Sequence, residues 1–133
     1  IYGLRTLEED KIRRVKSSFN IPYREAILLF VDGTNYFLSS ASLGVAFTSE
    51  AIYWRNCSLC ESQKVTWKEF KEKDYQVQLK EGLVVLKYNC EKRNFIGSKY
   101  KDVCTQEIGP NSSGLKHFEI AGIIKDVIPI LCP

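Results

Sequence analysis

Five cysteines and a single histidine are the residues of this sequence best suited to metal or redox chemistry. Cys57 and Cys60 have the Cys-x-x-Cys spacing that lets two thiolates on a tight loop meet one tetrahedral zinc ion. Cys90 and Cys104 are the residues that could complete such a site, but they do not form a second close pair, and His117 stands apart from them. We therefore expect no metal site.

The same Cys-x-x-Cys pair does not fit a redox centre. A thioredoxin-type pair sits at a helix N-terminus after a parallel strand, where the helix dipole lowers the thiol pKa. Cys57 and Cys60 instead lie between two strand-like segments. An odd cysteine count in a chain with enough apolar residues for a core predicts mostly reduced thiols rather than a disulfide scaffold. This cysteine usage favours the cytoplasm.

Basic and aromatic residues alternate between positions 90 and 101. Such a mixture can bind single-stranded nucleic acid by stacking and phosphate contact, but an exposed edge hairpin explains it as well. We favour the hairpin and expect no nucleic acid partner. The candidate partner-binding residues are Arg93, Lys99, Tyr100 and Lys101.

The residues that catalysis requires are not grouped in this sequence. A nucleophile, base and acid would need His117, which lies in an amphipathic segment where packed or surface histidines are common. No acidic residue stands alone inside an apolar strand, and no glycine-rich phosphate loop is present. We expect no enzyme activity and no cofactor.

Composition indicates one globular domain over residues 1–133. The sequence is 44% hydrophobic and 26% charged, and its net charge of +3 is too small to indicate a nucleic acid or a membrane surface as the partner. The longest apolar run, Ala26 to Val31, is far shorter than the ~20 residues that span a bilayer. No signal-peptide pattern is present, in keeping with a cytoplasmic protein.

The first half of the chain predicts a helix followed by strands. A capping box from Thr6 to Glu9 begins a helix at about Leu7. Its apolar stripe is Ile12, Val15 and Phe19, and Asn20 and Pro22 end it. Strands are expected over 26–31, 36–38, 43–48 and 51–55, with a turn at 32–35 and a loop at 39–42.

The second half predicts more strands and a closing helix. Val65 and Trp67 continue a strand into a charged segment at 68–73, which is expected to be a single helical turn or a tight corner. Strands follow over 75–80 and 83–88. Residues 115–128 have a helical apolar period that stops before Pro129, while a strand over 118–124 stays an alternative.

These elements predict an α+β fold. Its centre is an antiparallel bent β-sandwich or partly open barrel of about seven strands, with an N-terminal and a C-terminal helix. No repeat or linker divides the chain.

Three stretches of the sequence resemble a group of bacterial pleckstrin-homology-like (PH-like) domains, over about residues 7–88. The matching motifs are Asp32-Gly33-Thr34 at a strand end, the strand Ile52-Tyr53-Trp54-Arg55-Asn56 and the corner Trp67-Lys68-Glu69. The chain departs from the group at Ala51, in the cysteine-containing loop and at 39–42. The resemblance implies a binding or assembly module without catalytic residues or a cofactor.

The function we expect is that of a non-catalytic, cytoplasmic protein-binding module. A narrower version is a small immunity or antitoxin protein that binds and neutralises a toxin. The alternative is a PH-like domain that binds lipid or phosphate at a membrane surface. It requires one surface that gathers cations from two parts of the chain, namely Arg13, Arg14, Lys16, Arg93, Lys99 and Lys101.

Overall fold

The structure is a computed structural model, which describes residues 2–3, 9–32, 44–56, 59–80, 83–108, 126–127 and 129–130. Its helices are α1 (Glu9–Phe19) and α2 (Trp67–Glu72). Its strands are β1 (Tyr2–Gly3), β2 (Ile27–Asp32), β3 (Gly44–Thr48), β4 (Ala51–Arg55), β5 (Gln63–Thr66), β6 (Gln76–Lys80), β7 (Leu83–Arg93) and β8 (Lys99–Ile108).

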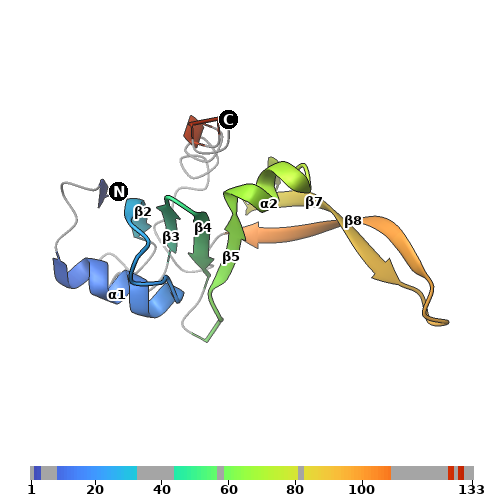
Figure 1. The fold of residues 1–133 in the computed structure, drawn as a ribbon, viewed down its shortest axis with the longest axis horizontal. Helices are drawn as coiled ribbons and strands as arrows, with labels where there is room; N and C mark the ends of the chain where they lie inside the picture. The colour runs from blue at the N-terminus through green and yellow to red at the C-terminus, as the bar shows by residue number, and fades with distance from the viewer. Residues whose placement is uncertain are drawn as a thin grey trace.

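The strands form two antiparallel sheets (Figure 1). The first has five strands in the order β1-β2-β3-β4-β5, and the second has three in the order β6-β7-β8. An α+β fold built on antiparallel strands is thereby confirmed. The described strands form two separate sheets that share one core cluster and do not close into a barrel.

Helix α1 covers one face of the first sheet. Val15 and Phe19 are fully buried and pack with Phe30, Ala46 and Tyr53 of the sheet. The expected apolar stripe is therefore confirmed, and the helix ends before Asn20, whose φ of 56° is left-handed and cannot continue a helix. The capping box expected at residues 6–9 lies partly outside the described residues.

The opposite face of the first sheet packs against α2 and the second sheet. The buried residues of this cluster are Val45, Phe47, Ile52, Trp54, Val65, Trp67, Phe70, Val84, Leu86 and Ile108. Because side chains alternate along a strand, Trp54 and Tyr53 reach opposite faces and both are buried, as the alternation predicted. One large aromatic residue thus anchors each layer.

Trp67 is the first residue of α2 rather than a continuation of β5, which corrects the expected strand. Thr66 and Glu69 form a capping box that starts the helix at this point. The Trp67 indole N–H donates to the Thr48 carbonyl at 2.9 Å, so the helix start is tied to the end of β3. The charged helical corner expected at 68–73 is confirmed.

Strands β7 and β8 extend well beyond the rest of the second sheet. Strand β6 pairs with β7 only as far as Lys87, whereas β7 and β8 pair from Val84–Ile108 out to Arg93–Lys99. We call residues 88–104 the arm and residues 92–100 the arm tip. Figure 1 shows the arm projecting away from the two sheets. The hairpin expected within 90–101 is confirmed, but β7 does not end at Tyr88.

Several expected elements lie outside the described residues, namely the turn at 32–35 after its first residue, the strand at 36–38, the loop at 39–42 and most of the closing helix. Residues 126–127 and 129–130 are helical, so helix continues past the expected end before Pro129. Val127 packs against the cluster that contains Trp54. Among the described helices, none is long and apolar enough to cross a bilayer.

Candidate functional site

A row of aromatic rings joins the arm to the body of the protein. Phe70 of α2 contacts Tyr75 at 4.8 Å between ring centroids, and Tyr75 stacks on Tyr88 at 4.6 Å. The Lys73 ammonium lies 5.8 Å from the centre of the Tyr88 ring, within the range of a cation–π contact. Burial, together with the nearby Tyr88 and Glu69, raises the pKa of Tyr75 to about 12. The base of the arm is therefore packed against α2.

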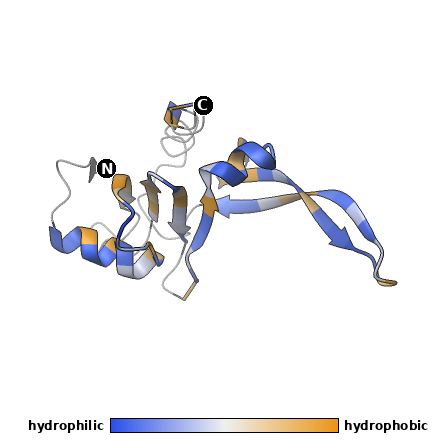
Figure 2. Ribbon diagram, viewed as in Figure 1, coloured by the Kyte–Doolittle hydropathy of each residue, from blue (hydrophilic) through white to orange (hydrophobic). Residues whose placement is uncertain are grey.

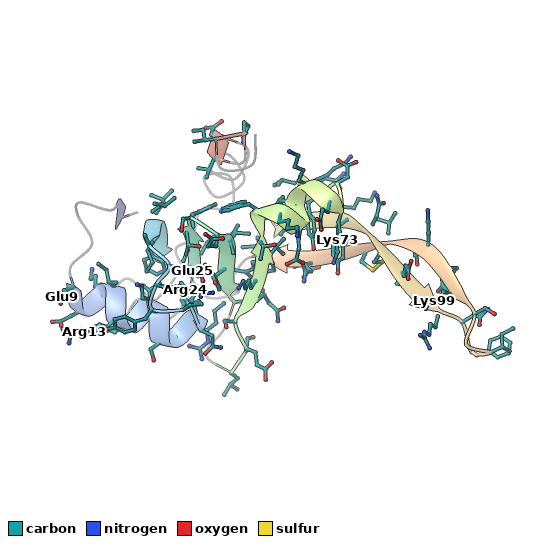
Figure 3. All side chains as sticks on the ribbon, viewed as in Figure 1. Glu9, Arg13, Arg24, Glu25, Lys73 and Lys99 are labelled. Atoms are coloured by element: carbon teal, nitrogen blue, oxygen red, sulfur yellow. A yellow bond between two sulfur atoms is a disulfide. The ribbon has the colours of Figure 1, made fainter. Side chains whose placement is uncertain are left out.

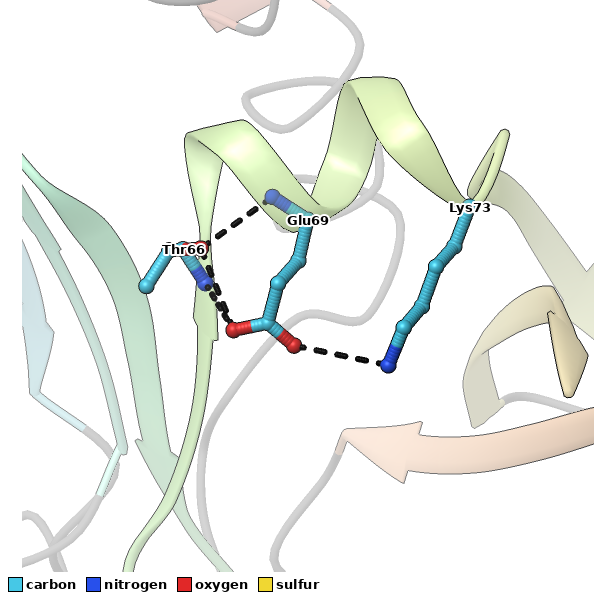
Figure 4. A network of polar contacts seen from close by, with 3 residues as sticks. All are labelled: Thr66, Glu69 and Lys73. Carbon is cyan, nitrogen blue, oxygen red and sulfur yellow. Dashed lines mark hydrogen bonds and ion pairs between the residues drawn. The ribbon is translucent and has the colours of Figure 1, made fainter.

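A polar network of Thr66, Glu69 and Lys73 connects the start of α2 to the aromatic contacts at the base of the arm (Figure 4). The Glu69 amide donates to the Thr66 hydroxyl oxygen at 3.1 Å, and Glu69 Oε1 accepts from the Thr66 amide at 3.4 Å. The other carboxylate oxygen, Oε2, lies 3.7 Å from the Lys73 ammonium. One carboxylate thus connects the helix start to the lysine that covers Tyr88.

A disulfide between Cys90 and Cys104 crosses the arm. In the ladder Cys90 faces Asp102 and Cys104 faces Tyr88, so the bond is diagonal between β7 and β8. Cys60 is disulfide-bonded as well. The expectation of mostly reduced thiols is therefore wrong for these residues, because strand pairing brings together two cysteines that are distant in sequence.

The disulfide also removes Cys90 and Cys104 from the zinc site that they could have completed. No group of three or more metal-ligating side chains occurs within the described parts of the chain. Cys57, Cys132 and His117 lie outside those parts.

A groove of about 790 Å³ lies between the end of α2 and the arm. Its lining contains two lysines, two acids, one aromatic ring, one amide and the disulfide, from Lys73, Tyr88, Asn89, Cys90, Glu91, Lys101, Asp102 and Cys104. Because its lining includes charges of both signs, the groove suits a polar segment that carries both donors and acceptors.

Ion pairing and backbone contacts order the arm further. The Lys92 ammonium lies 3.1 Å from Asp102 Oδ2, and Asp102 Oδ1 accepts from the Val103 amide at 2.7 Å. These two contacts, the backbone one being the larger, hold the pKa of Asp102 below its usual value. The ionised carboxylate that makes both contacts therefore persists to a lower pH than that of an ordinary aspartate.

Three backbone groups of the arm and its base bond to partners outside the β7–β8 ladder. The Val103 amide bonds to the Asp102 carboxylate, the Asn89 amide donates to the Lys73 carbonyl at 3.3 Å, and the Glu107 carbonyl accepts from the Asn56 side chain at 3.0 Å. These three backbone groups are therefore not available to hydrogen-bond with an added strand.

All four candidate partner-binding residues lie on the arm. Lys101 lines the groove, whereas Arg93, Lys99 and Tyr100 lie on the arm tip, where Arg93 and Lys99 face each other across the ladder. The cations of α1 are elsewhere. Figure 3 shows Arg13 and Lys99 at opposite ends of the molecule, so the six cations of the lipid alternative do not share one surface.

Sequence reasoning missed the buried carboxylate of Glu25, which is only 4% exposed. The Tyr53 hydroxyl donates to both of its oxygens, at 2.9 and 2.8 Å, and the Thr48 hydroxyl donates to Oε1 at 2.9 Å. Burial and the hydrogen bond to Glu25 both raise the pKa of Tyr53. A shallow hollow of about 370 Å³ adjoins this group. With three short hydrogen bonds, the carboxylate has a structural role.

No protein-family model, curated protein or solved structure matches this chain. The resemblance to bacterial PH-like domains therefore stays a prediction.

Proposed function

We propose that this chain is a non-catalytic protein-binding module and that the groove between α2 and the arm receives its partner. The observation that carries the proposal is that side-chain contacts and a disulfide hold the residues lining this groove in place. Tyr88 is held by Tyr75 and Lys73, and the arm is crossed by the Cys90–Cys104 disulfide. A preformed surface lowers the ordering cost of association, so its contacts contribute more to affinity.

The groove residues that are free to meet a partner are charged or polar. Asn89, Glu91 and Lys101 are exposed, and Glu91 faces Lys101 across the ladder. A partner segment with an acidic and a basic group spaced to match this pair fits the surface best, because charge complementarity sets register and excludes wrong partners. The narrower proposal of an immunity or antitoxin protein adds that this partner is a toxin inhibited by the complex.

The disulfide bears on where the protein works. Disulfides persist mainly in oxidising compartments and are rare in the cytoplasm. The Cys90–Cys104 bond therefore favours an oxidising compartment over the cytoplasm that the sequence led us to expect. An immunity function would then act outside the cytoplasm.

A paired charge reversal tests the groove. The variant Glu91→Lys with Lys101→Glu exchanges the two charges without changing the net charge. Its matched control, Lys68→Glu with Glu72→Lys, exchanges an exposed pair on α2 whose charged atoms lie 3.8 Å apart. Cross-linking in the source cells and mass spectrometry should recover one protein with the wild type and the control but not with the groove variant.

Equal recovery of that protein by the groove variant would refute binding in the groove. Turnover of a substrate by the purified chain would refute the non-catalytic assignment. If the recovered partner is an enzyme or a pore-forming protein, inhibition of its activity by the purified chain tests the immunity version directly.

A further inference from the structure

The arm ends in an ordered turn that exposes two large apolar side chains. The Gly97 amide donates to the Asn94 carbonyl at 3.0 Å, and Asn94 Oδ1 accepts from the amides of Ile96 and Ser98 at 3.1 and 2.9 Å. Gly97 has a φ of +87°, a conformation that glycine adopts readily. Phe95 is 101% exposed and Ile96 is 72% exposed. Figure 2 shows this hydrophobic end on an otherwise mostly hydrophilic arm.

Cations lie directly behind the apolar end, and one of them, Lys92, is ion-paired with Asp102. Arg93 faces Lys99, and the next pair inward is Lys92 with Tyr100. Because adjacent residues of a strand point to opposite faces, these two pairs occupy different faces. The acids Glu91 and Asp102 come only after them, further from the end. Polarity is thus layered along the arm, from apolar to cationic and aromatic, and then to mixed charge.

We propose that the arm tip binds the surface of an anionic lipid bilayer. A bilayer is the partner whose polarity changes in layers along one direction, in the same order as the arm. Phe95 and Ile96 would reach the acyl boundary, Arg93 and Lys99 the phosphate groups, and Tyr100 the interface that tyrosine favours.

This membrane contact is independent of the groove and goes beyond the proposed protein binding. The groove involves Glu91, Lys101 and residues nearer the body, so a protein held there would sit beside the membrane. It also differs from a surface shared with α1, because the cations of that helix lie at the other end of the molecule (Figure 3).

A charge-matched pair of variants tests the electrostatic part. The full chain is mixed with vesicles of phosphatidylglycerol and phosphatidylcholine, and with vesicles of phosphatidylcholine alone, and bound protein is measured by co-sedimentation. Arg93→Gln with Lys99→Gln should weaken binding to the anionic vesicles by about 30-fold. Arg13→Gln with Arg14→Gln removes the same charge from α1 and should change binding less than about threefold.

The apolar part is tested separately. Phe95→Ser with Ile96→Ser should weaken binding by more than about tenfold, and circular dichroism should show an unchanged fold because both side chains are exposed. In a Phe95→Trp variant, anionic vesicles should shift the new indole emission to shorter wavelength, and brominated lipid should quench it. The native Trp54 and Trp67 are buried, so they provide a constant background.

Three results would overturn the proposal. They are no binding to anionic vesicles, equal weakening by the α1 and arm-tip variants, and an emission spectrum of the Phe95→Trp variant that does not change upon binding. A purified partner protein that binds the wild type but not the Phe95→Ser, Ile96→Ser variant, in the absence of vesicle binding, would instead assign the tip to a protein. Loss of groove binding in the Glu91 and Lys101 variant leaves the vesicle result unaffected, so the two proposals fail separately.

Discussion

Tyr75 and Tyr88 stack at 4.6 Å with their rings only 12° from parallel, and this contact joins the arm to the rest of the protein. Tyr75 comes directly before β6, whereas Tyr88 lies just beyond the last β7 residue that β6 pairs. The stack therefore begins where the backbone pairing to β6 ends, and continues the support of the arm by side chains.

Removing one ring of this stack should loosen the arm. Tyr88→Ala is expected to lower the free energy of unfolding by about 1 to 2 kcal/mol, because Tyr75 and Lys73 lose their contact with the ring. Hydrogen exchange should quicken along the arm and stay unchanged in β3 and β4. Tyr88→Phe keeps the ring and serves as the control. Comparable losses in both variants would show that the hydroxyl, rather than stacking, matters.

The disulfide should be detectable by peptide mapping, and it should stabilise mainly the arm. An unreduced digest is expected to contain a peptide pair linked through Cys90 and Cys104. Replacing both by serine should cost up to about 3 kcal/mol, the loop-entropy value for a separation of 14 residues. Hydrogen exchange of residues 88–104 is the measurement, and reduction of the wild type should reproduce the effect. Two free thiols at these positions in the oxidised protein would contradict the assignment.

The buried carboxylate should be important for stability. Glu25→Ala leaves the Tyr53 hydroxyl without its acceptor inside the core, whereas the Thr48 hydroxyl keeps the Ala51 carbonyl at 3.2 Å. The substitution should cost about 2 to 4 kcal/mol in denaturant unfolding. Glu50→Ala removes a neighbouring exposed carboxylate and should cost less than about 0.5 kcal/mol. Similar losses from the two substitutions would mean that Glu25 is not enclosed as described.

Alkaline pH should lower the stability of the folded protein through Tyr75. The pKa of Tyr75 is about 12 in the folded protein, against 10.0 for an ordinary tyrosine, so the unfolded chain loses this proton first. Stability is therefore fully present below pH 10 and falls as the pH rises towards 12. Denaturant unfolding across this range measures the fall. Tyr75→Phe should make it shallower, and an unchanged slope would assign the effect to other groups.

The regular elements were predictable because their residues alternate locally. The period-two pattern of β4 and β6 and the helical stripe of α1 each depend on residues within a single element. The capping box at Thr66 and Glu69 was equally visible in the sequence, and applying it there would have moved Trp67 into a helix.

The candidate site was less predictable because it depends on pairings between distant segments. Cys90 meets Cys104 only once β7 and β8 adopt their register, and Glu25 is buried by Tyr53, which lies 28 residues further along the chain. The interleaved residues from Arg93 to Lys101 did indicate a hairpin. Its length follows from the extended pairing of β7 with β8, and the groove at its base follows from where the end of α2 meets the arm; neither is encoded within a single element.

The occupied backbone groups on the arm bear on how the protein behaves in concentrated solution. A long two-stranded ribbon ordinarily invites other chains to add strands and form aggregates. Here Asp102 occupies the Val103 amide, and Lys73 occupies that of Asn89. These two amides are therefore not available to an added strand, which lowers the tendency of the arm to polymerise at high protein concentration.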